Sequence, residues 1–127
     1  MGTGKRILVL DDEPIVGDRL KPALEKLGFE VETFTQSQAA IQRLVDQSFD
    51  VLVTDLKMQK PDGLEVMSFV REHSPATKVV IITGFATVET AVETMKGGAV
   101  DFIAKPFKIR ELCDLVVRLT SEGEEAG

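Results

Sequence analysis

Short runs of β-branched and aliphatic residues alternate along this chain with longer segments in which apolar residues recur every three or four positions. A chain with this alternation can bury its apolar faces by placing helices against a parallel sheet. The expected strands are residues 7–10, 29–34, 51–53, 79–82 and 100–104. The expected helices are residues 16–27, 40–45, 64–70, 88–95 and 109–119.

The same runs indicate where each strand lies in the sheet. Residues 7–10, 51–53 and 79–82 are continuously apolar, as strands buried on both faces are, whereas residues 29–34 alternate polar and apolar like a half-exposed edge strand. Right-handed crossovers then favour an α/β fold with a doubly wound five-stranded parallel sheet, of flavodoxin-like (βα)5 type and strand order 2-1-3-4-5. A closed barrel is disfavoured because the usual barrel needs eight such units.

The length of 127 residues predicts one domain, and the composition of the two chain ends places it at residues 5–120. Residues 1–4 are expected to be a flexible lead-in. Residues 121–127 are small, acidic and contain glycine, which is typical of the start of a linker or tail. The expected helix caps are Ser37, Gly28 and the pair Gly97 and Gly98.

Charge and composition narrow the functional classes. The net charge of −6 argues against direct binding of nucleic acid or of a membrane surface, and no apolar run approaches the ~20 residues that cross a bilayer. Cys113 is the only cysteine, which excludes an intrachain disulfide and suits a cytoplasmic protein. We interpret Cys113 as a small apolar residue of a helix and His73 as a surface residue.

Polar residues follow the ends of four expected strands. Asp11, Asp12 and Glu13 follow the first strand and Asp55 the third. Thr83 follows the fourth strand and Lys105 the fifth. These ends meet at one edge of an open α/β sheet, where ligands bind. Clustered carboxylates repel one another unless a cation neutralises them, and Mg2+, which takes one or two carboxylates and keeps several waters, fits better than Ca2+.

Each of these residues also has an ordinary structural interpretation. An acid at a strand end is often a loop or cap residue, and Asp12 before Glu13 and Pro14 could cap a helix. A lone Thr or Lys at such a place is usually structural or solvated. Their joint occurrence at matching strand ends favours one site. No phosphate-binding glycine loop, nucleophile elbow or Cys–His pair accompanies them.

At these positions the chain resembles the receiver domains of two-component signalling, the CheY-like family. On residues 84–102 it looks most like receivers of NtrC-type, sigma-54-dependent transcription activators, and FixJ-type and stand-alone receivers have similar stretches. The motifs that carry the family resemblance are Leu10-Asp11-Asp12-Glu13, Thr54-Asp55-Leu56-Lys57-Met58, Asp62-Gly63-Leu64-Glu65, Ile82-Thr83-Gly84 and Phe102-Ile103-Ala104-Lys105-Pro106-Phe107.

The resemblance implies that Asp55 accepts a phosphoryl group with the help of Mg2+. Asp12 would bind the metal directly and Asp11 through water, and Asp55 and the backbone carbonyl of Lys57 would complete the protein's share of the ligands. Phosphoryl transfer depends on positioning and charge neutralisation, which a metal ion and a lysine supply.

The resemblance also implies a switch. Thr83 would hydrogen-bond a phosphoryl oxygen, and Lys105, joined to Pro106 by a cis peptide bond, would pair with Asp55 and then with the phosphate. Phe102, where the family often has Tyr, would be the aromatic residue that changes rotamer with Thr83. An alternative is that Phe102 is an ordinary residue of the sheet edge.

Two departures from the family pattern concern the loops around Asp55. Gln59 stands where a Pro is common and Pro61 lies just before Asp62, so the acceptor loop could differ in shape. Lys57 and Phe85 occupy the two positions that tune phosphoryl-group lifetime in the family. Neither is a carboxylate or amide that would orient a hydrolytic water, which favours slow self-hydrolysis.

The leading interpretation is a signalling module that is phosphorylated by a sensor histidine kinase and is not a turnover enzyme. Its output, through the fourth helix, fifth strand and fifth helix, would control transcription by downstream ATPase and DNA-binding domains, with a phosphorylation-dependent homodimer as one route. One rival is a magnesium-dependent phosphohydrolase with Asp55 as nucleophile, but its usual second acid would stand at Lys57. The other rival is a degenerate receiver that acts by protein contact alone.

Overall fold

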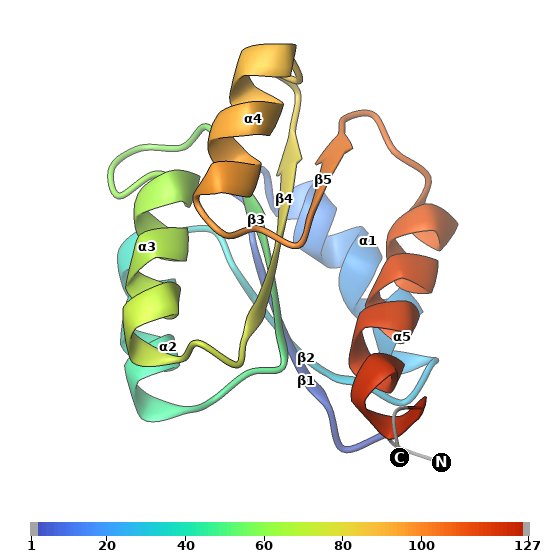
Figure 1. Ribbon diagram of the computed structural model, residues 1–127. Coiled ribbons are helices and arrows are strands. Elements are labelled where there is room, and N and C mark those ends of the chain that lie inside the picture. The colour runs from blue at the N-terminus through green and yellow to red at the C-terminus, as the bar shows by residue number, and fades with distance from the viewer. Residues whose placement is uncertain (1–2, 126–127) are drawn as a thin grey trace.

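The computed structural model describes residues 3–125 and contains five βα units (Figure 1). The strands are β1 (Arg6–Leu10), β2 (Glu30–Phe34), β3 (Val51–Asp55), β4 (Lys78–Thr83) and β5 (Asp101–Ala104). The helices are α1 (Pro14–Glu25), α2 (Ser37–Asp46), α3 (Gly63–His73), α4 (Val88–Lys96) and α5 (Ile109–Glu125). All strand pairs are parallel and the order is β2-β1-β3-β4-β5, which confirms the predicted fold class.

The sheet separates two apolar cores because successive side chains of a strand point to opposite faces. Ile7 and Val9 of β1 belong to the core that includes residues of α1 and α5, whereas Leu8 and Leu10 belong to the core that includes residues of α2 and α3. Figure 1 shows these two pairs of helices on opposite sides of the sheet. Burial on both faces accounts for the continuous apolar runs of the inner strands.

The edge strand and two strand boundaries follow from local packing. β2 has one buried residue, Val31, as expected of a half-exposed edge. It begins one residue later than predicted, because the Phe29 N–H donates to the Leu24 oxygen at the end of α1. β5 also begins one residue later than predicted. The Val100 N–H donates to the Val79 oxygen, but the paired residues of β4 and β5 start only at Val80 and Asp101.

One of the expected helix caps, Ser37, is wrong. Ser37 is the first residue of α2 with a buried side chain, and Gln36 occupies the cap position. Gly28 closes the end of α1 as predicted, because it has a φ of 95°, its N–H donates to the Glu25 oxygen at 2.9 Å and the next N–H, of Phe29, donates to the Leu24 oxygen. Gly97 caps α4 as predicted.

The ends of the chain differ from the simple expectation. α5 continues through Glu125, beyond the expected helix end at residue 119. The remaining tail residues and residues 1–2 of the expected lead-in lie outside the described residues. Cys113 is buried in the core and His73 is exposed, both as predicted. Within residues 3–125, no helix combines the length and apolarity needed to cross a membrane.

Candidate functional site

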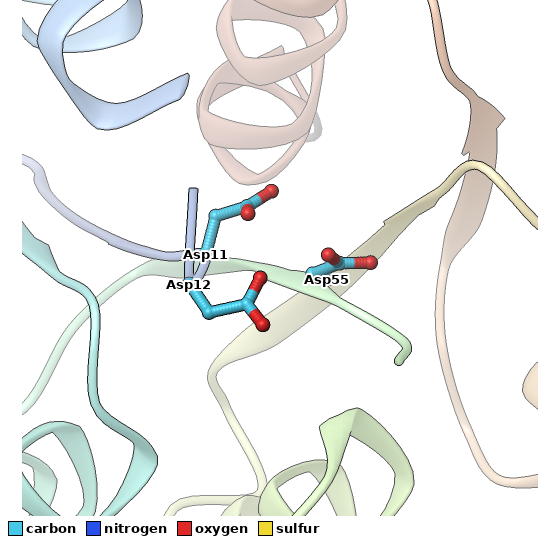
Figure 2. A group of neighbouring side chains, drawn as sticks. All are labelled: Asp11, Asp12 and Asp55. Atoms are coloured by element: carbon cyan, nitrogen blue, oxygen red, sulfur yellow. The ribbon is translucent and has the colours of Figure 1, made fainter. Parts of the chain in front are cut away.

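Three carboxylates gather at the carboxyl edge of the sheet (Figure 2). Asp11 and Asp12 follow β1 and Asp55 ends β3, and these strand ends are adjacent because Leu10 pairs with Thr54. One oxygen from each of the three acids lies within 4.8 Å of the others. Asp11 and Asp55 are only 2% and 6% exposed, whereas Asp12 is exposed. The predicted convergence of the acidic pair on Asp55 is therefore confirmed.

Burial disfavours the ionised form of both Asp11 and Asp55. Burial raises the pKa of Asp55, and the neighbouring charge of Asp11 raises it further, although Lys105 and the Lys57 backbone N–H lower it in part. Burial likewise raises the pKa of Asp11, against the effect of Lys105 and of a backbone hydrogen bond from Glu13. A cation bound at this place would stabilise the ionised form of both acids.

Lys105 joins the three strand ends through its ammonium group. Its Nζ lies 2.7 Å from Asp11 Oδ2, 2.9 Å from Glu13 Oε1 and 3.2 Å from Asp55 Oδ2. Burial alone would lower the pKa of Lys105, but the carboxylates raise it above its ordinary value, so the side chain stays charged. The peptide bond to Pro106 is cis, as the sequence motif predicted.

Glu13 is a site residue to which the sequence analysis assigned no role. Its side chain contacts Lys105, and its backbone N–H donates to Asp11 Oδ1 at 2.8 Å. It also occupies the N-cap position of α1, which had been one interpretation of Asp12, but its side chain makes no capping hydrogen bond. The available signal was a third acid directly after the acidic pair.

Thr83 and Phe102 lie on adjacent strands near this edge. Thr83 is fully buried, and its Oγ1 accepts a hydrogen bond of 3.0 Å from the Phe85 N–H. Phe102 pairs with Ile81 in the β4–β5 ladder and is half-buried against the core on the α2 and α3 side. The hydroxyl is thus held by its own loop, and the switching roles of both residues stay predictions.

The loop after β3 approaches the backbone of the acceptor closely. A Cβ at Gly63 would overlap the carbonyl oxygen of Asp55, so a side chain at this position would displace the loop. α3 starts there with a reciprocal cap, in which Asp62 accepts from the Glu65 N–H at 3.0 Å and Glu65 accepts from the Asp62 N–H at 3.3 Å. The start of α3 therefore fixes the loop beneath Asp55.

The middle of this loop contains a second cis peptide bond, between Lys60 and Pro61, which the sequence analysis did not predict. It lies in the acceptor loop, for which Gln59 at the usual proline position and Pro61 before Asp62 had predicted a different shape. Lys57 is exposed and its backbone N–H bonds the Asp55 carboxylate. A metal-binding role for the Lys57 carbonyl remains a prediction.

Comparison with known proteins gives a consistent assignment. Residues 7–117 match the model of the response regulator receiver domain family. The chain is 37% identical over 113 residues to the regulatory protein AtoC of Escherichia coli strain K12, covering 89% of this chain and 24% of AtoC. It is 35% identical to the transcriptional regulatory protein FixJ of Bradyrhizobium diazoefficiens, covering 99% of this chain and 62% of FixJ. The chain thus spans only part of these relatives.

Solved structures agree with the fold. A CheY-like response regulator receiver domain protein from Methanospirillum hungatei superimposes with a TM-score of 0.91 and 29% identity, covering 98% of this chain and 100% of that one. The BeF3-activated DrrB receiver domain gives a TM-score of 0.89 and 26% identity, covering 94% of this chain and 100% of that one. With the sheet order, the acidic edge and the family match in agreement, this chain belongs to the response regulator receiver domains of two-component signalling.

Proposed function

We propose that Asp55 accepts a phosphoryl group from a sensor histidine kinase and that the domain passes this event to an output. The observation that carries the proposal is the placement of Asp55. It is a buried carboxylate at a strand end, 3.2 Å from Lys105 Nζ and grouped with two further acids. Such surroundings suit phosphoryl transfer, which depends on positioning and on neutralising charge.

In the transfer, an Asp55 oxygen attacks the phosphorus atom in line with the bond from phosphorus to the donor nitrogen. That bond breaks and its electron pair stays on the imidazole of the donor histidine, which leaves an aspartyl phosphate on the receiver. The Lys105 ammonium stands beside the attacking carboxylate and offsets the charge that gathers on the phosphoryl oxygens.

The acid cluster fits a hard divalent cation, because its donors are carboxylate oxygens within 4.8 Å of one another and burial raises the pKa of two of the acids. We assign Mg2+ to Asp12 and Asp55 directly and to Asp11 through water, with the Lys57 carbonyl as a further ligand. When bound, Mg2+ supplies positive charge to the transferring group.

A groove beside Lys105 supports a docking site for the kinase. It has a volume of ≈ 420 Å³ and is lined by Glu13, Ile15, Val16, Arg19, Lys105, Pro106, Phe107 and Ile109. Ile15 is exposed at the start of α1, next to the acidic edge. An apolar surface this close to the acceptor suits a partner that must bring a phosphohistidine to Asp55.

The added phosphoryl charge, about −1 or more, gives new acceptor oxygens at the sheet edge. We assign the response to Thr83, whose hydroxyl would leave the Phe85 N–H for a phosphoryl oxygen, and to Phe102 on the next strand. The domain would act as a cytoplasmic switch that phosphorylates and slowly dephosphorylates itself without turning over a substrate, rather than as a phosphohydrolase.

Transcription control is the output that the relatives support, since FixJ is a transcriptional regulatory protein and AtoC a regulatory protein. We propose downstream ATPase and DNA-binding domains of the NtrC type, so that this domain itself does not contact nucleic acid. Determining the coding sequence beyond residue 127 tests this arrangement: a stop codon there would exclude it.

Incubation with acetyl phosphate and Mg2+, followed by intact mass measurement, tests the phosphoacceptor. The wild type should gain one phosphoryl group and Asp55→Asn none. Labelling of the Asn variant to the wild-type level would move the acceptor to another residue, and an unlabelled wild type would support the reading of a receiver that acts by contact alone.

A further inference from the structure

We propose that Glu13 is a positioning residue for Lys105. In this view Glu13 holds the Lys105 ammonium at the mouth of the site, so that Asp11 and Asp55 can turn their oxygens to a divalent cation. The inference rests on the proposed function, because it concerns the same acidic edge.

The three carboxylates around Lys105 have different surroundings. Asp11 and Asp55 are buried and belong to the group of acids that could hold a metal ion. Glu13 lies outside that group, and its side chain is 63% exposed. A cation and Lys105 would therefore compete for Asp11 and Asp55, whereas the Glu13 carboxylate pairs with Lys105 and is not one of the candidate metal ligands.

A lysine paired only with the ligands of a cation would oppose binding of that cation, since like charges repel. Glu13 offers the ammonium an acceptor at 2.9 Å on the solvent side, closer than the Asp55 oxygen at 3.2 Å. The ammonium donates hydrogen bonds to Glu13 and Asp55, whereas Asp11 Oδ2 pairs with it by charge at 2.7 Å without a hydrogen bond. Glu13 therefore holds the Lys105 ammonium toward the solvent side of the site, while the ammonium stays within hydrogen-bond distance of Asp55.

The backbone fixes Glu13 in this place independently of its side chain. Its N–H donates to Asp11 Oδ1 at 2.8 Å, and the residue precedes Pro14 at the start of α1. The side chain makes no capping hydrogen bond, so the contact with Lys105 is its one hydrogen bond to another side chain among the described residues. Substitution of Glu13 should therefore alter Lys105 without removing a cap of α1.

Calorimetric titration with Mg2+ tests the proposal, because the chain contains neither Trp nor Tyr to report binding by fluorescence. Glu13→Ala should weaken the Mg2+ affinity about two- to fivefold, the range of one exposed ion pair. Glu13→Gln should lose less, since its amide oxygen can still accept from Lys105. Asp18→Ala, which removes an exposed acid from the same helix, should leave the affinity unchanged. Circular dichroism checks that each variant is folded.

A double-mutant cycle with Lys105→Ala decides the mechanism. If Glu13 acts through Lys105, Glu13→Ala should have no further effect on Mg2+ affinity in the Lys105→Ala background. The same loss in both backgrounds, or a loss in Glu13→Ala as large as that of Asp12→Ala, would overturn the proposal in favour of a direct effect of Glu13 on the metal. An unchanged affinity in Glu13→Ala would also overturn it.

The rate of labelling by acetyl phosphate at saturating Mg2+ gives a second readout. Glu13→Ala should be slower than wild type by a similar factor, because Lys105, no longer held by Glu13, pairs more closely with the Asp55 carboxylate that must attack. An equal or faster rate would overturn this part of the proposal. A wild-type protein that takes no phosphoryl group would instead overturn the proposed function, and the inference with it.

Discussion

Lys57 Nζ lies 6.0 Å from the centroid of the Phe85 ring, so the loop after β3 and the loop after β4 meet beside the acceptor through a cation–π contact. Both side chains are exposed. A cationic amine and a phenyl ring present no oxygen acceptor that could orient a water molecule for attack on phosphorus. The phosphoryl group on Asp55 should therefore be long-lived.

The first prediction follows from this contact. Lys57→Asn should speed the loss of the phosphoryl group about tenfold, because its amide can hydrogen-bond a water molecule next to a charged group, a contact worth about 1.5 kcal/mol. Lys57→Met removes the charge but supplies no amide, and it should leave the lifetime near that of wild type. Intact mass measured at intervals after removal of acetyl phosphate gives the rates. Equal lifetimes in the Asn and Met variants would contradict the prediction.

The second prediction concerns the metal. Asp12 is the exposed member of the acid cluster, and the positive charge of Lys105 contacts its two neighbours instead. Asp12→Ala should reduce the affinity for Mg2+ by more than about tenfold, a loss above ~1.4 kcal/mol. Calorimetric titration measures this directly. If the affinity is unchanged, the direct ligand is Asp11 or another residue.

The third prediction is a pH dependence of stability without metal. The pKa of Asp55 in the folded protein is raised above the ordinary value of 3.8, chiefly by burial. The stability that this carboxyl contributes is thus fully present below pH 3.8 and is lost as the pH rises through the raised pKa. Asp55→Asn should therefore be more stable than wild type at pH 7 in EDTA, and the difference should shrink as the pH falls toward 3.8.

Urea unfolding followed by circular dichroism, at several pH values, measures this difference. Glu30→Gln serves as a control, because that acid is exposed on the edge strand β2. A difference between Asp55→Asn and wild type that grows toward acid pH would show that the ion pair with Lys105 outweighs the cost of burial.

The fold and most of the site could be predicted because both depend on regular periodicity. Two-sided burial leaves continuous apolar runs at the inner strands, and parallel strands place their carboxyl ends at one edge, which brings Asp55 to the acidic pair. The cap at Ser37 could not be predicted, since its burial depends on tertiary packing. The contact between Glu13 and Lys105 joins residues 92 positions apart, and no local pattern indicates which acid a lysine will contact.

The fourth prediction concerns a buried hydroxyl in α4. Thr94 is fully buried, and its Oγ1 has no hydrogen-bond partner among the described residues. Thr94→Val keeps the shape of the side chain and removes the unsatisfied group, so it should raise the free energy of unfolding by about 1 kcal/mol. Thr77→Val is the matched control, because the Thr77 hydroxyl donates to the Phe49 oxygen at 2.6 Å in a buried place. The control should lower the free energy of unfolding by a similar amount.

A surface on α4 provides the basis of the fifth prediction. Val88 is 81% exposed, and Val92 and Met95 of the same helix are also exposed, whereas the buried residue of this helix is Thr94. Figure 1 shows α4 close to β4 and β5. A helix that leaves its large apolar residues in solvent is available for a protein contact.

We therefore expect phosphorylation to change self-association through the face formed by α4, β5 and α5. Thr83 and Lys105 would contact the phosphoryl oxygens, and they lie at the ends of the two strands next to this face, so a local change of charge has a short packed route to the surface. A coupling of about 1–3 kcal/mol is typical and would change the dimerisation constant by one to two decades.

Sedimentation with and without beryllofluoride, a stable phosphoryl mimic, measures the change. Val92→Lys should abolish it, and Val45→Lys, at an exposed apolar position on α2, should not. An identical monomer–dimer equilibrium in both states would exclude this face as a self-association surface, while leaving the assignment of Asp55 intact.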